Sequence, residues 1–142
     1  MSAIPHLLCV EPGVYRSGQP PPTADSISEL AGLGITRAVK LNSGTDSLGP
    51  CITIQQFDLN LWDQLVEPDN DELHRAVDAI VPGTLVHCEN GNDRTGLVVA
   101  LYRLKRGWSK ADAESEMLDN GFHKTELGLW SYWRKQNEKD WI

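Results

Sequence analysis

Residues 84–106 combine an apolar strand, a short polar loop and a strongly apolar helix. The strand has the sequence TLVHC, the loop has the sequence ENGNDRTG, and the helix is expected over residues 97–106. A strand followed by a loop and a helix is the alternating pattern of α/β proteins with a mostly parallel central sheet. This segment therefore predicts an α/β fold.

The rest of the chain alternates between the same two kinds of element. Runs of β-branched and apolar residues predict further strands at residues 14–16, 35–42 and 51–59. Apolar spacing and capping residues predict a helix that begins after Thr23 or Ser26 and ends near residue 33, and helices over residues 73–80, 109–120 and 125–139. We expect a central, mostly parallel sheet of four or five strands flanked by helices, in a single domain over residues 1–142.

The charge of the chain argues against two classes of partner. It carries 20 acidic and 13 basic side chains, a net charge of -7, and so lacks the cationic surface that nucleic acids and anionic membranes attract. Six of the acids lie between Asp58 and Glu72, where there is no base. Three cysteines without a CxxC pair indicate neither a disulfide framework nor a zinc site, and no signal sequence or membrane span is visible. We therefore expect a soluble, cytoplasmic protein.

Residues 88–94, which we call the cysteine loop, have the composition of an anion site. When such a loop curls, its backbone N–H groups and the N-terminus of the following helix point at one spot about the size of a phosphate. The same field favours the thiolate form of Cys88, at the end of the strand. Arg94 adds a planar guanidinium that holds two phosphate oxygens at once. The backbone N–H groups that would face the anion belong to Glu89, Asn90, Gly91, Asn92, Asp93 and Arg94.

Residues 87–96, HCENGNDRTG, resemble the HCxxGxxRTG signature of the cysteine-dependent protein tyrosine and dual-specificity phosphatases. Six specified residues make this pattern far more specific than a glycine-rich loop alone. The segments VYRSGQPPP, AVKLN and GLVVALYRLKRGWSKADAESEMLDNGF are also similar to the small dual-specificity-type phosphatases of microbes and phages. The resemblance covers most of residues 13–133, and it implies a protein-tyrosine-phosphatase-like fold of the dual-specificity type.

The resemblance also implies a mechanism and assigns residues to it. Cys88 attacks phosphorus and forms a cysteinyl-phosphate intermediate, while Arg94 and the amides of the cysteine loop hold the transferring phosphoryl group. Thr95 donates a hydrogen bond to the sulfur and assists its departure. His87 is the family histidine that buttresses the loop. No metal and no cofactor is expected, because the arginine and the amides supply the positive field.

The reaction needs a general acid to protonate the leaving oxygen. In the family this aspartate lies on a loop that here is the acidic stretch, which offers Asp58, Asp63 and Asp69. Asp58 lies at a strand end and Asp69 is placed to cap the next helix, so we expect Asp63 to be the acid. Asp93 is an alternative, because phosphoinositide phosphatases of the myotubularin and Sac type have an aspartate at the position before the arginine.

The leading functional hypothesis is a dual-specificity protein phosphatase that acts on phosphotyrosine and other phosphorylated side chains. Phosphoinositides, inositol phosphates and RNA 5′-triphosphates are alternative substrates of enzymes with this signature. These polyanions attract clustered lysines and arginines, which the cysteine loop lacks. A non-catalytic phosphate-binding module is the alternative of another class, although such modules commonly lose the cysteine. We expect a phosphorylated protein or a small phosphomonoester as the partner.

Overall fold

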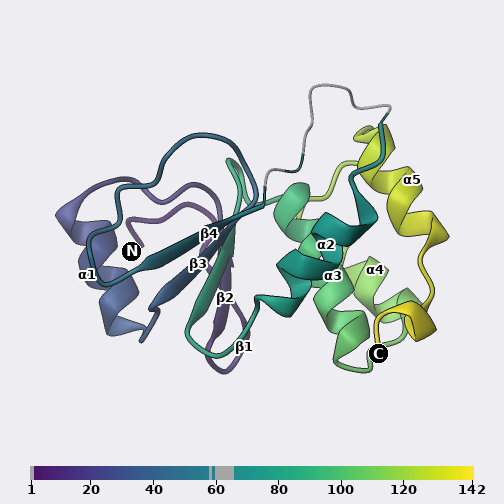
Figure 1. The fold of residues 1–142 in the computed structure, drawn as a ribbon, viewed down its shortest axis with the longest axis horizontal. Coiled ribbons are helices and arrows are strands. Elements are labelled where there is room, and N and C mark those ends of the chain that lie inside the picture. Colours follow the sequence, from purple (N-terminus) through teal and green to yellow (C-terminus); the bar gives the residue numbers. More distant parts are fainter. Residues whose placement is uncertain (1, 58, 60–65) are drawn as a thin grey trace.

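The computed structural model describes residues 2–57, 59 and 66–142. In these parts of the chain, five strands form one sheet in the order β1-β2-β5-β3-β4 (Figure 1). The strands are β1 (Leu8–Glu11), β2 (Val14–Ser17), β3 (Arg37–Lys40), β4 (Thr53–Gln56) and β5 (Thr84–His87). β1 and β2 are antiparallel, whereas the pairs β2–β5, β5–β3 and β3–β4 are parallel. The predicted α/β fold with a mostly parallel sheet is confirmed.

Among the α-helices of the described residues, the sheet separates α1 from the other four (Figure 1). α1 (Ala24–Gly32) covers one face, where Leu30 packs in a small apolar cluster with Leu85 of β5 and Leu48. The larger core lies on the opposite face, beneath α2 (Asn70–Asp78), α3 (Arg94–Lys105), α4 (Lys110–Asp119) and α5 (Leu127–Lys135). Successive residues of β5 alternate between these two faces, as expected for a strand buried on both sides.

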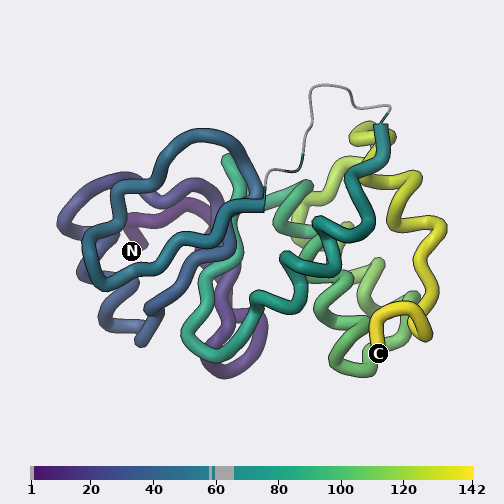
Figure 2. The backbone as a smooth tube through the Cα atoms, in the orientation of Figure 1, coloured from purple at the N-terminus to yellow at the C-terminus, as the bar shows by residue number. Residues whose placement is uncertain are grey.

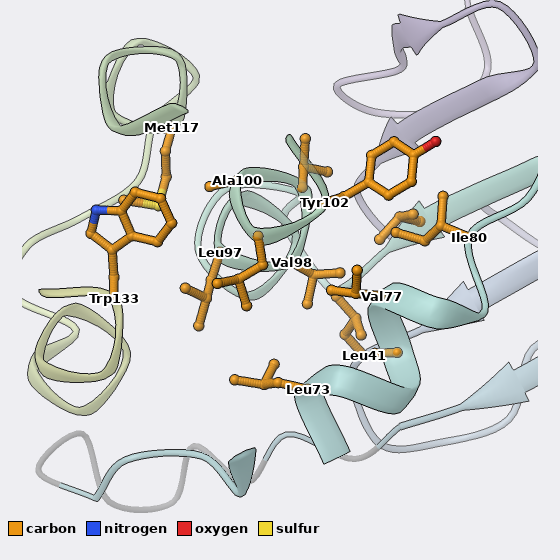
Figure 3. Close-up of a cluster of buried hydrophobic side chains, with 14 of the residues drawn as sticks. Leu41, Leu73, Val77, Ile80, Leu97, Val98, Ala100, Tyr102, Met117 and Trp133 are labelled. Carbon is orange, nitrogen blue, oxygen red and sulfur yellow. The ribbon is translucent and has the colours of Figure 1, made fainter. Parts of the chain in front are cut away.

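α3 is the centre of the larger core. Ten of its twelve residues are buried. Figure 3 shows Leu97 and Val98 of this helix with Val77 of α2 on one side and Trp133 of α5 on the other. Each fully buried apolar side chain of this size contributes about 1.5–3 kcal/mol to folding. This packing holds the N-terminus of α3 rigidly next to the end of β5.

β5 is the middle strand of the sheet. Figure 2 shows it, in the teal-green of the middle of the sequence, beside the purple β2 from near the N-terminus. His87, the last residue of β5, pairs with Ser17 of β2 on one side and with Lys40 of β3 on the other. Segments far apart in the sequence therefore meet where β5 leads into the cysteine loop.

Several predicted element boundaries need correction. α3 begins at Arg94 instead of residue 97, because the last loop residues already form its first turn. The helix expected over residues 125–139 ends at Lys135, and a separate 3₁₀ turn follows at Glu138–Asp140. β1 was not predicted, because its four residues form a largely exposed edge without a clear apolar alternation. None of the helices in the described residues is long and apolar enough to span a membrane.

Candidate active site

The cysteine loop joins the end of β5 to the start of α3. Cys88 directly follows β5 and is buried, with 3% of its surface exposed. The backbone N–H of Gly91 donates a hydrogen bond to Cys88 Sγ at 3.2 Å. Gly91 has a φ of 82°, a left-handed conformation that turns the backbone over the sulfur and that other residues adopt at a cost. The loop therefore curls around its own cysteine.

β2 and the segment that follows it pack against this loop. Gln19 N donates to Glu89 O at 2.8 Å, and Arg16 Nη2 donates to Gly91 O at 2.9 Å. A Cβ atom built on Gly91 would lie 2.6 Å from Gly18 N, and one built on Gly18 would lie 3.0 Å from Glu89 O. A side chain at Gly91 would require the neighbouring backbone to shift, and one at Gly18 would be tighter than an ordinary contact, because the two backbones lie directly against each other.

Arg16 anchors the cysteine loop. The sequence leaves its role open between an anchor and a surface side chain, and the structure places it in the interior with 3% of its surface exposed. Burial lowers the pKa of its guanidinium, and the nearby Glu116 partly opposes that shift. The guanidinium remains charged in either case. Its hydrogen bond to Gly91 O fixes the carbonyl of the residue whose N–H faces the sulfur.

His87 is fully buried and lies between two acceptors. Its Nε2 is 2.6 Å from Asp46 Oδ2, and its Nδ1 is 3.5 Å from the carbonyl oxygen of Cys88. Burial by itself raises the pKa of Asp46, but hydrogen bonds from His87 and Lys40 outweigh it and hold that pKa well below its ordinary range. Sequence reasoning did not find Asp46 or Lys40. The sequence feature that could have pointed to this pair is Lys40 itself, a lysine within an apolar run that is typical of a buried strand.

Arg94 and Thr95 begin α3. Arg94 is partly buried in the first turn, next to the loop amides. Thr95 Oγ1 is buried and has no hydrogen-bond partner among the described residues. The predicted hydrogen bond from Thr95 to Cys88 Sγ is therefore not formed in this structure, and the sulfur accepts from Gly91 N instead.

The remaining loop residues form its outer edge. Glu89 and Asn90 are exposed, and Asn92 is partly buried. A Cβ atom on Gly121 would lie 3.1 Å from Asn92 Oδ1, so the turn that follows α4 lies against this side of the loop. Among the residues that the structure describes, no group of three or more His, Cys, Asp or Glu side chains is placed to hold a metal ion.

The candidates for the general acid have different outcomes. Asp63 and Asp58 lie outside the described residues. Asp69 is the N-cap of α2 and accepts a hydrogen bond from Glu72 N, which confirms its expected capping role. Asp93 precedes α3, and its carboxylate accepts from His123 N at 2.7 Å and lies 3.0 Å from His123 Nδ1.

The fold and the site together place the chain in the class of cysteine-dependent phosphatases, because a buried thiol and an arginine share one curled loop between a parallel strand and a helix. The family model described as "PTP-SAK: Swiss Army Knife protein, DSP-PTPase phosphatase domain" matches residues 5–129. The chain belongs to this family.

Relatives and solved structures agree with this assignment. The dual specificity protein phosphatase TpbA of Pseudomonas aeruginosa is 51% identical over 39 residues, which are 27% of this chain and 18% of that protein. The chain therefore matches less than a fifth of the length of this relative. The crystal structure of P. aeruginosa TpbA has a TM-score of 0.80 at 25% identity, covering 95% of this chain and 87% of that one.

A yeast protein shares the fold. The core catalytic domain of the PP-IP phosphatase SIW14 from S. cerevisiae has a TM-score of 0.74 at 19% identity, covering 98% of this chain and 91% of that one. At this identity the likeness concerns the fold alone. A TpbA variant has been crystallised with phosphotyrosine, with a TM-score of 0.80 to this chain at 25% identity and coverage of 95% and 86% of the two chains.

Proposed function

We propose that the chain hydrolyses phosphomonoesters of tyrosine, serine and threonine side chains in proteins, with Cys88 as the nucleophile. The observation that carries this proposal is the curled cysteine loop, in which Gly91 N donates to Cys88 Sγ at 3.2 Å and Arg94 starts the adjoining helix. A loop of this shape directs backbone dipoles and a helix N-terminus at one point. It favours both a thiolate and a bound phosphate.

The proposed reaction has two steps. In the first, Cys88 Sγ attacks phosphorus, the bond from phosphorus to the ester oxygen breaks, and a general acid gives its proton to the leaving alcohol. In the second, water attacks the cysteinyl phosphate, loses a proton to the same carboxylate, and releases inorganic phosphate and the thiolate. Arg94 and the amides of the cysteine loop hold the three equatorial oxygens throughout. Asp63 is the proposed acid and Asp93 its alternative, with Thr95 and His87 in supporting roles.

The charge around the loop supports a substrate with a single phosphate. Glu89 and Asp93 bring carboxylates to the loop, which contains no lysine. A substrate with several phosphates is repelled by such carboxylates, whereas the charge of one phosphoryl group is balanced by Arg94 and the amides. The phosphotyrosine complex of TpbA supports the same class of substrate. Inositol phosphates are the second candidate, because the yeast PP-IP phosphatase SIW14 has the same fold.

The cysteines support a reducing compartment. Cys9, Cys51 and Cys88 are all free thiols, and the first two are exposed. Exposed free thiols persist mainly in the reducing cytoplasm, so we include a cytoplasmic location in the proposal.

The test is the release of p-nitrophenol from its phosphate by the wild type, Cys88→Ser and Cys9→Ser. Cys9→Ser is the matched control, because it removes an exposed thiol outside the loop. We expect the wild type and Cys9→Ser to be equally active and Cys88→Ser to be inactive. Equal rates for all three, or no activity in a thiol-reduced wild type, would overturn the proposal, and the second result would favour a non-catalytic phosphate-binding module.

The substrate class is tested on a panel of phosphotyrosine, phosphoserine and phosphothreonine peptides, inositol polyphosphates, phosphoinositides and triphosphorylated RNA. We expect the highest kcat/KM with phosphopeptides. A higher kcat/KM with any of the polyanions would replace the protein-phosphatase proposal while leaving the role of Cys88 unchanged.

A further inference from the structure

A buried polar cluster lies behind the cysteine loop, on the face of the sheet that α1 covers. His87 points to this face, as Leu85 does two residues earlier, whereas Cys88 packs with the larger core on the other face. The side chains of His87 and Cys88 therefore project to opposite faces of the sheet. The members of the cluster come from the segment after β2, from β3 and the loop that follows it, and from β5; they are Gln19, Lys40, Asn42, Asp46 and His87.

The hydrogen bonds of this cluster are complete around its ion pair. Lys40 Nζ donates to Asp46 Oδ1 at 2.7 Å and to Asn42 Oδ1 and Gln19 Oε1 at 3.1 Å each, which uses all three of its protons. Gln19 Nε2 donates to Asp46 Oδ1 at 2.7 Å. The second carboxylate oxygen, Asp46 Oδ2, is left for His87 Nε2 at 2.6 Å.

A buried ion pair of this kind contributes little net stability to a fold. The side chain of Lys40 is 2% exposed and that of Asp46 is fully buried. Removing both charges from water costs free energy that their attraction only partly returns, and apolar residues of similar volume are often at least as stabilising. A fully satisfied buried network does, however, fix the geometry of its members closely.

The geometry that is fixed here is that of the residues around the nucleophile. His87 immediately precedes Cys88, and its backbone oxygen accepts from Leu41 N at 2.9 Å. Gln19 belongs to the cluster through its side chain, while its backbone N–H donates to Glu89 O at 2.8 Å. The cluster therefore holds the residue on each side of Cys88.

We propose that Asp46 is a positioning residue for the reaction, which acts through His87 on Cys88. The carboxylate contacts His87 Nε2 at 2.6 Å and locks the orientation of the ring, and the ring in turn fixes the strand end from which the cysteine projects. Lys40 and Gln19 keep the carboxylate ionised and in place. The inference rests on the proposed role of Cys88 and adds a residue 42 positions away in the sequence.

The loop that carries Asp46 has an anchor of its own. Leu48 is 3% exposed and packs in the cluster beneath α1 with Leu30 and Ile35. Loss of the Asp46 carboxylate should therefore leave this loop attached to the sheet, so that an effect on catalysis can be measured in a folded protein.

The first comparison is between Asp46→Asn and Asp25→Asn. Asp25 is an exposed acid in the first turn of α1, so its variant has the same change in net charge. We expect kcat to fall about 10- to 100-fold in Asp46→Asn, as for loss of a buried hydrogen bond to a charged group, with KM changed less than about threefold. Asp25→Asn should match the wild type. A kcat in Asp46→Asn equal to that of Asp25→Asn would overturn the proposal.

A double-mutant cycle with His87→Gln separates positioning from a general structural role. If Asp46 acts through His87, Asp46→Asn lowers kcat by less than about threefold once His87 is replaced. If Asp46→Asn lowers kcat by the same factor in the His87→Gln background as in the wild type, the proposal is contradicted. Because Asp46→Asn alone leaves Lys40 buried without a counter-charge, the Asp46→Asn/Lys40→Gln double variant is measured as well. It should fold and keep the loss of kcat, and a normal kcat in this variant would also overturn the proposal.

Cys88→Ser, measured in the same assay, separates failure of the proposed function from failure of the proposed role of Asp46. An active Cys88→Ser refutes the proposed function itself. An inactive Cys88→Ser beside fully active Asp46 variants refutes only the role of Asp46.

Discussion

Replacing Gly91 with alanine tests the contact between the cysteine loop and the strand beneath it. The Cβ atom of Gly91→Ala would lie 2.6 Å from Gly18 N and 2.7 Å from the carbonyl carbon of Ser17. Both atoms belong to the backbone and cannot rotate away. The loop must therefore move away from Gly18, and the hydrogen bond from Gly91 N to Cys88 Sγ moves with it.

Two costs combine in this variant. Placing an alanine at a φ of 82° costs about 1–2 kcal/mol, and forcing an additional methyl group into a closely packed site costs about 1–3 kcal/mol. The free energy of unfolding should therefore fall by about 2–5 kcal/mol. The value of kcat/KM should also fall, by about 100-fold, because a displacement of about 1 Å at a reacting site lowers rates by that factor.

The assay is urea unfolding together with kcat/KM, with Gly107→Ala as the matched control. Gly107 has a similar φ of 92°, but nothing lies within 4 Å of its Cβ position. The control should lose only the backbone term of about 1–2 kcal/mol and keep full activity. If Gly91→Ala is as stable and as active as Gly107→Ala, the loop does not depend on this contact and the reasoning is wrong.

Three further predictions concern charge. Because the pKa of Asp46 is lowered in the folded state, its carboxylate stabilises the fold fully above the pKa that Asp46 has in the unfolded chain, about 4, and this stabilisation is lost as the pH falls below that value. In urea unfolding, the difference in the free energy of unfolding between the wild type and Asp46→Asn should therefore become smaller in acid. A difference that stays constant with pH would contradict this. Arg103→Met breaks the mostly buried ion pair with Glu116 and should lower the free energy of unfolding, measured by thermal unfolding, by about 3–5 kcal/mol. Lys105→Met removes the exposed pair with Asp78 and should lower it by less than about 1 kcal/mol. Equal losses in the two variants would contradict this prediction. Asp63→Asn should lower kcat and flatten its decline at high pH, where a general acid loses its proton, whereas Asp93→Asn should keep the wild-type pH profile; the reverse result would make Asp93 the acid.

The part of the site that is continuous in the sequence could be predicted from it. The residues from His87 to Arg94 are neighbours in the chain, and a strand followed by a short loop and a helix leaves them few arrangements. Local geometry was therefore sufficient to place the thiol and the arginine in one loop. The capping role of Asp69 was equally local, because an N-cap bonds to a residue three positions away.

The parts that could not be predicted depend on contacts between distant segments. Asp46 lies on a loop after β3 and reaches His87 only because the sheet places β3 beside β5. Arg16 could be an anchor or a surface residue until the register of β2 against β5 was known. The absence of a hydrogen bond between Thr95 and the sulfur depends on side-chain placement within a single turn, which a motif does not determine.

In the proposed mechanism, Cys88 carries the phosphoryl group during turnover. The most direct measurement is mass spectrometry of the wild type after rapid acid quenching during turnover of a phosphotyrosine peptide. We expect a peptide of this chain with the phosphate on Cys88 Sγ, formed while substrate is present and lost when the substrate is exhausted. Turnover without any phosphate on Cys88, or with phosphate on a different residue, would contradict it.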